Sequence, residues 1–207
     1  MKISVILGHP DINSFNFAIA DTVVTILRDV GHEVIFHDLY REEFPPVIHA
    51  EEIPKEVLLP DIVAEHCREI AETEGIIIVH PNWWGQPPAI LKGWIDRVIR
   101  PGVAYEFKDG DNGEGVPTGL LRARAALVFS TSNTYPERER SVFGDPLETI
   151  WKNCIFDLCG VKTFHRRNLE VIVTSTPEQR HEWLREAAET TLRCFPPENN
   201  VSSIISI

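Results

Sequence analysis

The sequence predicts an α/β protein whose core is a doubly wound, five-stranded parallel sheet. Short apolar runs rich in β-branched residues alternate with longer segments in which apolar residues recur at helical spacing. Polar or aromatic loops follow the first, third and fourth of these runs, as at the edge of an open parallel sheet where ligands bind. Residues 1–207 are expected to form one domain, because five strands alternate with five helices along the chain. Right-handed crossovers then leave few possible topologies.

The first half of the chain supplies three of the predicted strands. In chain order the pattern indicates a strand over 3–7, a helix over 15–30 that stops at Gly31, a strand over 32–40, a helix over 61–73, a strand over 75–79 and a helix over 89–99. Residues 41–59 combine proline with acidic residues and show no clean period. They are therefore expected to form a long excursion whose Phe44 packs against the domain.

The second half supplies the two remaining strands. Residues 100–121 are glycine-rich and are predicted to be a loop, which at this length is usually functional or disordered. It is followed by a strand over 124–130, a helix over 145–158, a strand within 161–173, a helix over 177–195 and a tail over 199–207.

Composition narrows the class of protein. The net charge of -11 argues against nucleic acids or anionic membranes as general partners. Four cysteines show neither a CxxC pair nor metal-ligand spacing, so we expect reduced thiols and no metal site. No apolar run approaches membrane-spanning length, and the N-terminus is typical of a strand rather than a signal peptide. The expected location is the cytoplasm.

The loop after the first strand is a candidate anion site. It leads into a helix, whose first N–H groups and positive dipole end favour a phosphate. Ser14 and Asn16 add side-chain donors there. The loop matches neither GxxxxGK[ST] nor GxGxxG, so neither a P-loop nucleotide nor a Rossmann dinucleotide is indicated. The alternative is that Ser14 is an ordinary N-cap.

Tandem tryptophans mark the loop after the third strand. Trp83 and Trp84 would be costly on a surface loop unless a flat ligand covers them; alternatively, both fill the core beneath the loop. After the fourth strand, residues 131–134 are four small polar residues and form a third candidate loop. In a flavodoxin-like strand order, 2-1-3-4-5, the three strands are neighbours, so the three loops converge on one crevice.

With these motifs in place, the chain resembles the flavodoxin-like NAD(P)H:quinone oxidoreductases, which include DT-diaphorase and the bacterial flavoproteins that accompany potassium–proton antiporters. Four stretches carry the resemblance over nearly the whole chain: 9–16, 89–94 after an aromatic pair, 101–105, and 143–145 with Trp151 and 159–160. The second of these motifs is the most specific.

The resemblance implies a flavin site and a reaction. Hydride would pass from NADH or NADPH to the flavin and then to a quinone or similar acceptor, with no side chain acting as acid or base in the hydride step. The implied cofactor is FMN, favoured over FAD because the C-terminal extension of the longer enzymes is missing. The implied cofactor-binding residues are His9, Ser14, Phe15, Asn16, Pro81, Asn82, Trp83, Trp84, Gly85, Thr131, Ser132, Asn133 and Thr134.

The substrate side of the site would come from two subunits. The resemblance implies a homodimer in which the 101–121 loop, with Tyr105 and Phe107, lies across the partner's flavin. Phe143 stands where some relatives have histidine, and Asn133 and Thr134 stand where some have two glycines. Two alternatives stay open, a flavodoxin-type electron carrier and a flavin-binding regulatory subunit of an ion antiporter. An α/β hydrolase is disfavoured because the chain has no GxSxG motif.

Overall fold

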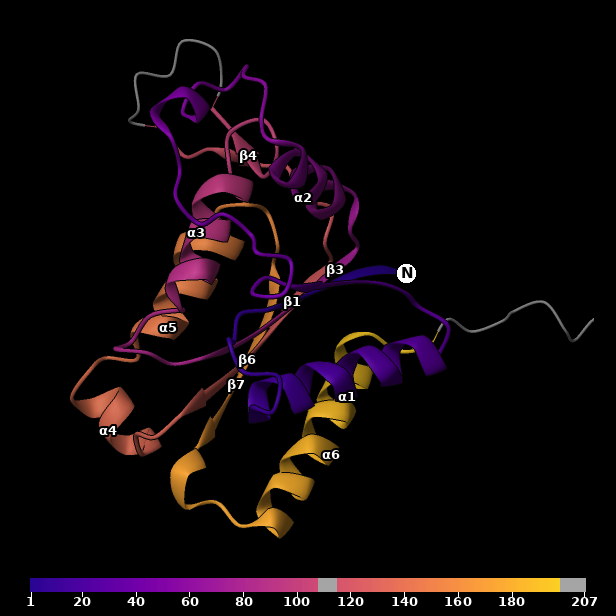
Figure 1. Ribbon diagram of the computed structural model, residues 1–207, viewed down its shortest axis with the longest axis vertical. Coiled ribbons are helices and arrows are strands. Elements are labelled where there is room, and N and C mark those ends of the chain that lie inside the picture. Colours follow the sequence, from indigo (N-terminus) through magenta and orange to yellow (C-terminus); the bar gives the residue numbers. More distant parts are fainter. Residues whose placement is uncertain (108–114, 198–207) are drawn as a thin grey trace, which may run out of the picture.

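The computed structural model describes residues 1–107 and 115–197, and its centre is a five-stranded parallel sheet (Figure 1). The strands are β1 (Lys2–Leu7), β2 (Glu33–Asp38), β3 (Gly75–Pro81), β6 (Ala125–Ser132) and β7 (Thr163–Glu170). Their order is β2-β1-β3-β6-β7. Because β6 and β7 are the fourth and fifth strands of this sheet, the predicted order 2-1-3-4-5 is confirmed.

Helices cover both faces of the sheet. On one face α1 (Phe15–Asp29) and α6 (Pro177–Cys194) lie side by side (Figure 1). The other face carries α2 (Asp61–Glu72), α3 (Ala89–Val98), the short α5 (Pro146–Glu148) and a π-helix, η2 (Thr149–Phe156). Val5 and Leu7 pack toward α1, whereas Ile6 packs toward α2 and α3, as the alternation of side chains along a strand requires. Every residue of β3 is buried, so this central strand is covered by helices on both faces of the sheet.

Two strands run further than the sequence analysis predicted. The ladder continues through the pairs His80–Ser130, Pro81–Thr131 and Ser132–Glu170. Pro81, Thr131 and Ser132 are therefore the last residues of β3 and β6, and the prediction that they belong to loops was wrong. The backbone of these candidate residues is held in the sheet, and only Asn82 onward and Asn133 onward form loops.

The helical pattern over 145–158 is split in the structure into α5 and η2. A short helix, α4 (Pro136–Ser141), was not predicted, and the excursion and the segment after β7 contain single 3-10 turns, η1 (Ala50–Glu52) and η3 (Ile172–Thr174). The predicted 100–121 loop contains a small hairpin, β4 (Tyr105–Glu106) with β5 (Thr118–Gly119). Residues 108–114 of that loop and the predicted tail over 199–207 lie outside the described residues.

The excursion after β2 is anchored on α3. Phe44 is buried as predicted, and the Arg97 guanidinium binds the Glu52 carboxylate through two hydrogen bonds of 2.9 and 2.7 Å. Arg97 is 1% exposed, so this is a buried, bidentate ion pair. A Cβ on Gly93 would lie 2.1 Å from the Pro46 carbonyl oxygen, and only glycine permits this approach. Among the described residues, no helix is both long and apolar enough to cross a membrane.

Candidate functional site

The carboxyl ends of β1, β3 and β6 meet at a crevice made of two adjoining cavities. The first, of about 360 Å³, lies at the start of α1 and is called here the α1 cavity; it is lined by His9, Asn13, Ser14, Phe15, Asn16, Pro81, Asn82, Trp83, Thr131, Ser132, Asn133, Ile172 and Arg180. The second, of about 750 Å³, is called the Trp cavity; it is lined by Asn82, Trp83, Trp84, Gly85, Ser132, Asn133, Thr134, Glu139, Phe143 and Pro146.

All thirteen residues that the sequence nominated for the cofactor line one of these two cavities, and Phe143 joins them. Tyr105 and Phe107 do not. They contact each other edge to face, with ring centroids 5.9 Å apart, at the far end of α3 from the tryptophan loop (Figure 1). The described part of this one chain thus brings together every nominated residue except the two expected to act on a partner subunit.

At the start of α1, Ser14 is the N-cap, and its hydroxyl accepts a hydrogen bond from the Phe17 N–H at 3.1 Å. The alternative interpretation of Ser14 is therefore confirmed, although the residue still lines the cavity. Burial lowers the pKa of His9, whose Nδ1 accepts from the Asp11 N–H at 3.0 Å. The same Nδ1 lies 3.2 Å from the Asp11 carbonyl oxygen, so Asp11 holds this side of the ring.

Asn16 is placed differently from the expectation that it donates to a phosphate. It is 3% exposed, and its Nδ2 donates to Thr131 Oγ1 at 2.9 Å, which ties α1 to the end of β6. Its Oδ1 is buried and has no hydrogen-bond partner among the described residues. An unpaired buried acceptor is costly, so the geometry of Asn16 fits a ligand that donates a hydrogen bond, such as a hydroxyl.

The tryptophan loop is a tight turn that holds both indoles outward. Trp83 and Gln86 exchange two backbone hydrogen bonds of 3.1 Å, and the Gly85 N–H donates to Asn82 Oδ1 at 2.9 Å. Trp84 and Gly85 have φ angles of 59° and 72°. The Trp84 side chain is fully exposed and Trp83 is 43% exposed. The alternative that both tryptophans fill the core is therefore wrong.

Beneath this loop the core is filled by other residues. His80 is fully buried, its Nδ1 lies 2.8 Å from the Pro81 carbonyl, and its Nε2 lies 3.0 Å from the Trp151 indole nitrogen. Burial lowers the pKa of His80 to about 4, so the ring is neutral at pH 7. The Nδ1–H donates to the carbonyl and Nε2 accepts from the indole, which fixes the end of β3 against η2.

At the end of β6 the small polar residues are held by local contacts. The Thr134 N–H donates to Ser132 Oγ at 3.0 Å, and Asn133 Oδ1 accepts from the Val173 N–H at 2.9 Å. Asn133 therefore connects the crevice to η3. This arrangement leaves the Asn133 amide N–H₂ as a donor on the cavity side.

Five lining residues were missed by the sequence analysis, Asn13, Glu139, Pro146, Ile172 and Arg180, and two of them are charged. Glu139 of α4 is 4% exposed, and its carboxylate accepts from Asn82 Nδ2 at 3.0 Å, so it orients the amide that closes the tryptophan turn. Arg180 of α6 lies at the α1 cavity, where it donates to Ser175 Oγ at 2.8 Å and sits 6.0 Å from the Phe15 ring centroid. Neither position carries a sequence signal, because each becomes part of the crevice only through folding of a remote helix.

The crevice has the dimensions and the donor set that a flavin requires. Cavities of about 300–1,000 Å³ with a few placed polar groups are typical of cofactor sites. The α1 cavity joins a helix start and an arginine, which suit a phosphate, to the unpaired Asn16 oxygen, which suits a hydroxyl. The Trp cavity offers exposed aromatic faces, which suit a flat ring system.

Comparison with known proteins identifies the class. A family model described as "Flavodoxin-like fold" matches residues 1–193. The chain belongs to this flavodoxin-like family, and the resemblance inferred from its motifs is confirmed.

The relatives carry the names of NAD(P)H oxidoreductases and dehydrogenases. The Haemophilus influenzae "Uncharacterized NAD(P)H oxidoreductase" is 33% identical over 162 residues, which cover 76% of this chain and 78% of that protein. The Rattus norvegicus "NAD(P)H dehydrogenase [quinone] 1" is 34% identical over 123 residues, but the match covers only 50% of this chain and 44% of the rat protein. The solved NAD(P)H:quinone oxidoreductase from Methanothermobacter marburgensis superposes with a TM-score of 0.79 at 25% identity, over 92% of this chain and 95% of that one.

Proposed function

We propose that this protein is a flavin-dependent NAD(P)H oxidoreductase that reduces quinones or similar acceptors by two electrons. The observation that carries the proposal is the convergence of three strand ends on one crevice lined by all thirteen nominated cofactor residues. The names of the relatives support the same activity. When bound, the flavin supplies the hydride chemistry, and the protein binds and orients the reactants.

The α1 cavity would hold the phosphate end of FMN. The N–H groups at the start of α1 and the Arg180 guanidinium would face the phosphate, and Asn16 Oδ1 would accept from a hydroxyl of the connecting chain. The cavity adjoins the Trp cavity, with which it shares four lining residues, Asn82, Trp83, Ser132 and Asn133. FAD is the alternative cofactor.

The Trp cavity would hold the ring system. Trp83 and Trp84 would form an apolar wall, and residues 131–134 would supply donors for the negative charge that a reduced ring carries at its pyrimidine end. Phe143 would lie at the substrate side of the same cavity. Glu139 would act as a positioning residue, through its hydrogen bond to Asn82.

We also propose that two chains form a homodimer, in which Tyr105 and Phe107 face the partner's flavin. Other exposed apolar residues lie near Tyr105 and Phe107 in the folded chain, and they support a buried interface there. The Arg100 guanidinium donates to the Glu52 and Pro54 carbonyls, so Ile53, which is 68% exposed, lies close to the segment that leads into β4. Phe107 is 46% exposed in the single chain. With four free cysteines among the described residues, the cytoplasm stays the proposed location.

Cofactor identity and turnover test this proposal together. Heat should release about one FMN, or else FAD, per chain from purified protein, as measured by mass spectrometry and absorbance. The same preparation should oxidise NADH or NADPH in the presence of a quinone. Apo protein that takes up neither flavin at micromolar concentration would overturn the proposal. Flavin binding without two-electron turnover would instead favour the electron carrier or the antiporter subunit.

A further inference from the structure

Residues 143–146, called here the α4–α5 turn, form part of the wall of the Trp cavity. Asp145 has a φ angle of 48° and the glycine before it has a φ of 72°, so two successive residues are left-handed. On either side of this pair, Phe143 and Pro146 line the Trp cavity. Pro146 also lies against the tryptophan loop, since a Cβ on Gly85 would be 2.7 Å from its ring. The conformation of this turn therefore sets the shape of one side of the cavity.

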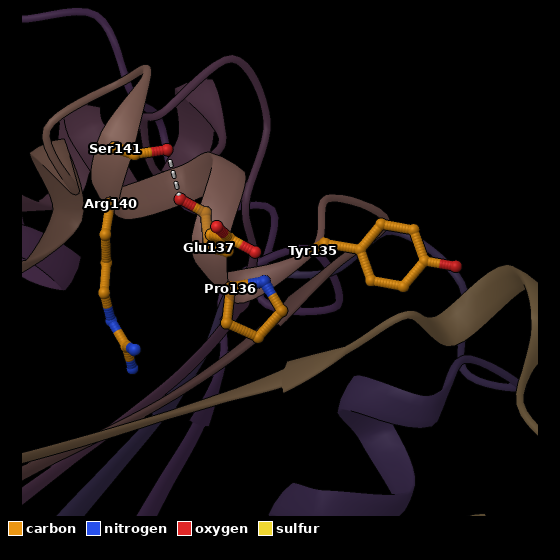
Figure 2. A pocket seen from close by; sticks show the side chains of 5 residues that line it. All are labelled: Tyr135, Pro136, Glu137, Arg140 and Ser141. Carbon is orange, nitrogen blue, oxygen red and sulfur yellow. Dashed lines mark hydrogen bonds between the residues drawn. The ribbon is translucent and has the colours of Figure 1, made fainter.

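Helix α4 leads into the turn, but it is too short to hold the turn by itself. The Ser141 hydroxyl donates to the Glu137 carbonyl within the helix at 2.7 Å (Figure 2). The residues drawn in Figure 2 line a separate cavity, and none of them lines the Trp cavity. The Asp145 N–H donates to the Glu139 carbonyl at 2.9 Å, which joins the turn to the helix. A helix of six residues is unstable without tertiary contacts, so this join needs support from the sheet.

That support comes from Arg166 of β7. Its guanidinium binds Asp145 Oδ2 through Nη2, and it binds Glu148 Oε2 through Nε at 3.0 Å. Asp145 precedes α5 and Glu148 ends it, and the arginine side chain is 7% exposed. Arg166 pairs with Val128 in the sheet, so it projects toward the layer that contains α5 and η2. One buried guanidinium thus attaches both ends of α5 to the sheet.

The Asp145 side chain serves this ion pair and not the cap of a helix. An aspartate that directly precedes a helix ordinarily accepts from the first N–H groups of that helix. Here the side chain makes no such bond. Within the described part of the chain, Arg166 is the residue whose side chain binds this carboxylate. A left-handed φ is uncommon for a residue with a side chain and persists where surrounding contacts fix it, as Arg166 does here.

The ion pair contributes to orientation more than to stability. Burying two charges costs free energy that their attraction only partly returns. Arg166 Nη1 and Asp145 Oδ1 are also buried without a hydrogen-bond partner among the described residues, which adds to this cost. A contact of this kind is better suited to selecting one geometry of the turn than to stabilising the fold.

We propose that Arg166, which lines neither the α1 cavity nor the Trp cavity, is a positioning residue for the acceptor. Through Asp145 it fixes the α4–α5 turn, so that Phe143 and Pro146 present one rigid wall to a flat acceptor in the Trp cavity. This inference rests on the proposed function, and it adds a residue on which the reaction depends without contact with the reactants.

Two variants test the positioning role kinetically. Arg166→Lys keeps the buried charge, but an ammonium cannot hold two carboxylates as a planar guanidinium does. It should lower kcat/KM for the quinone by roughly 10-fold or more, mainly by raising KM, because a small displacement of the wall is enough for such a loss. Asp145→Gly should behave alike, although glycine adopts a left-handed φ most easily. An Asp145→Gly variant with the parent's kcat/KM would overturn the proposal, since the backbone alone would then shape the turn.

Flavin affinity should stay close to that of the parent in both variants, because neither residue lines the α1 cavity. Arg167→Lys is the matched control, since Arg167 is the next residue of β7 and pairs with Glu186 of α6 on the other face of the sheet. The double variant Arg166→Lys/Asp145→Gly should lose no more than the more affected single variant, because both changes break one contact. Losses that multiply, or an equal loss in Arg167→Lys, would contradict the positioning role.

Hydrogen exchange of the flavin-free protein tests the turn without turnover. Because the Asp145 N–H is bonded to the Glu139 carbonyl, peptides covering 143–148 should exchange roughly 10-fold faster in Arg166→Lys than in the parent. Exchange in Arg167→Lys should match the parent. Equal protection in all three proteins would overturn the proposal. Failure of the proposed function has a separate signature, namely a parent protein without flavin in which Arg166→Lys still loosens the turn.

Discussion

The Trp151 indole nitrogen donates to His80 Nε2 across 3.0 Å, and both side chains are buried directly beneath the tryptophan loop. His80 thereby joins the end of β3 to η2, the helix behind the Trp cavity. Because Nε2 must remain unprotonated to accept this bond, the contact is maintained only while the ring is neutral. The hydrogen bond that holds the core beneath the tryptophan loop therefore depends on pH.

The first prediction is a loss of stability in mild acid. Burial lowers the folded-state pKa of His80 from 6.5 to about 4, so below pH 6.5 the unfolded chain binds a proton that the folded chain does not. The contribution of His80 to the free energy of unfolding is complete above pH 6.5. It is lost as pH falls toward 4, by on the order of 3 kcal/mol.

Urea unfolding at pH 7, 6, 5 and 4.5 would measure this slope in the parent and in His80→Gln, which keeps a polar side chain without a titrating group. Glu42, whose pKa is lowered to about 2, loses its contribution below pH 4.5 and so outside this window. The variant should be less stable at pH 7 but show a flatter profile. Equal slopes in the two proteins would show that His80 does not titrate there.

The sheet and the positions of the candidate loops could be predicted because they follow from local patterns. Each buried strand is a β-branched run, and strand order then fixes which loops meet. Helix α4 could not be predicted, because its six residues, 136–141, carry alternating acidic and basic side chains and have no apolar face. The burial of Glu139 depends on this helix folding over Asn82, a contact between residues 57 positions apart that no local pattern encodes. Arg180 could not be predicted for the same reason.

The second prediction concerns Asn16, whose Nδ2 is engaged by Thr131 while its Oδ1 is unpaired. Asn16→Ala should weaken flavin binding by about 0.5–1.5 kcal/mol, or roughly 2- to 12-fold, the range for a hydrogen bond between neutral groups, as measured by fluorescence titration. Asn16→Asp should weaken it less, because a carboxylate still accepts from a ligand hydroxyl. A larger loss in Asn16→Asp than in Asn16→Ala would mean that the amide donates to the phosphate, as the sequence alone suggested.

The third prediction separates the two tryptophans. Trp83 lines both cavities and its ring centroid lies 6.3 Å from that of His9, whereas the fully exposed Trp84 lines the Trp cavity alone. Trp83→Ala should lower flavin affinity by roughly 2- to 12-fold, the range expected for one stacking contact. Trp84→Ala should lower flavin affinity by less than Trp83→Ala does, and it should lower kcat/KM for the quinone. If Trp84→Ala lowered flavin affinity more than Trp83→Ala, Trp84 would be the residue that lies against the flavin.

The fourth prediction is the homodimer. Light scattering at working concentration should give twice the 23.5 kDa mass of the chain. Phe107→Asp should shift the equilibrium toward the monomer and reduce turnover in parallel, because it places a charge on an apolar surface while the fold of each chain stays intact. Dilution of the parent should reproduce that loss of turnover. A parent monomer with full turnover would exclude a site shared between subunits.

The last prediction turns on Phe143, which lines the Trp cavity at 49% exposure with the Arg138 guanidinium 5.4 Å from its ring centroid. A phenyl ring can neither ionise nor donate, so residues 131–134 must suffice as donors if the flavin is reduced in this cavity. Phe143→His would add a group with a pKa near ~6.5 in water, and the neighbouring arginine would lower it.

Rapid-mixing rates of flavin reduction by NAD(P)H should then gain a pH-dependent limb in the variant that the parent lacks. The limb should lie below pH 6.5, because Arg138 disfavours the protonated ring. His9 and His80 are present in both proteins, so only the difference between the two profiles reports residue 143. Superimposable profiles from about pH 5.5 to 8 would mean that residue 143 does not face the flavin, although it lines the same cavity.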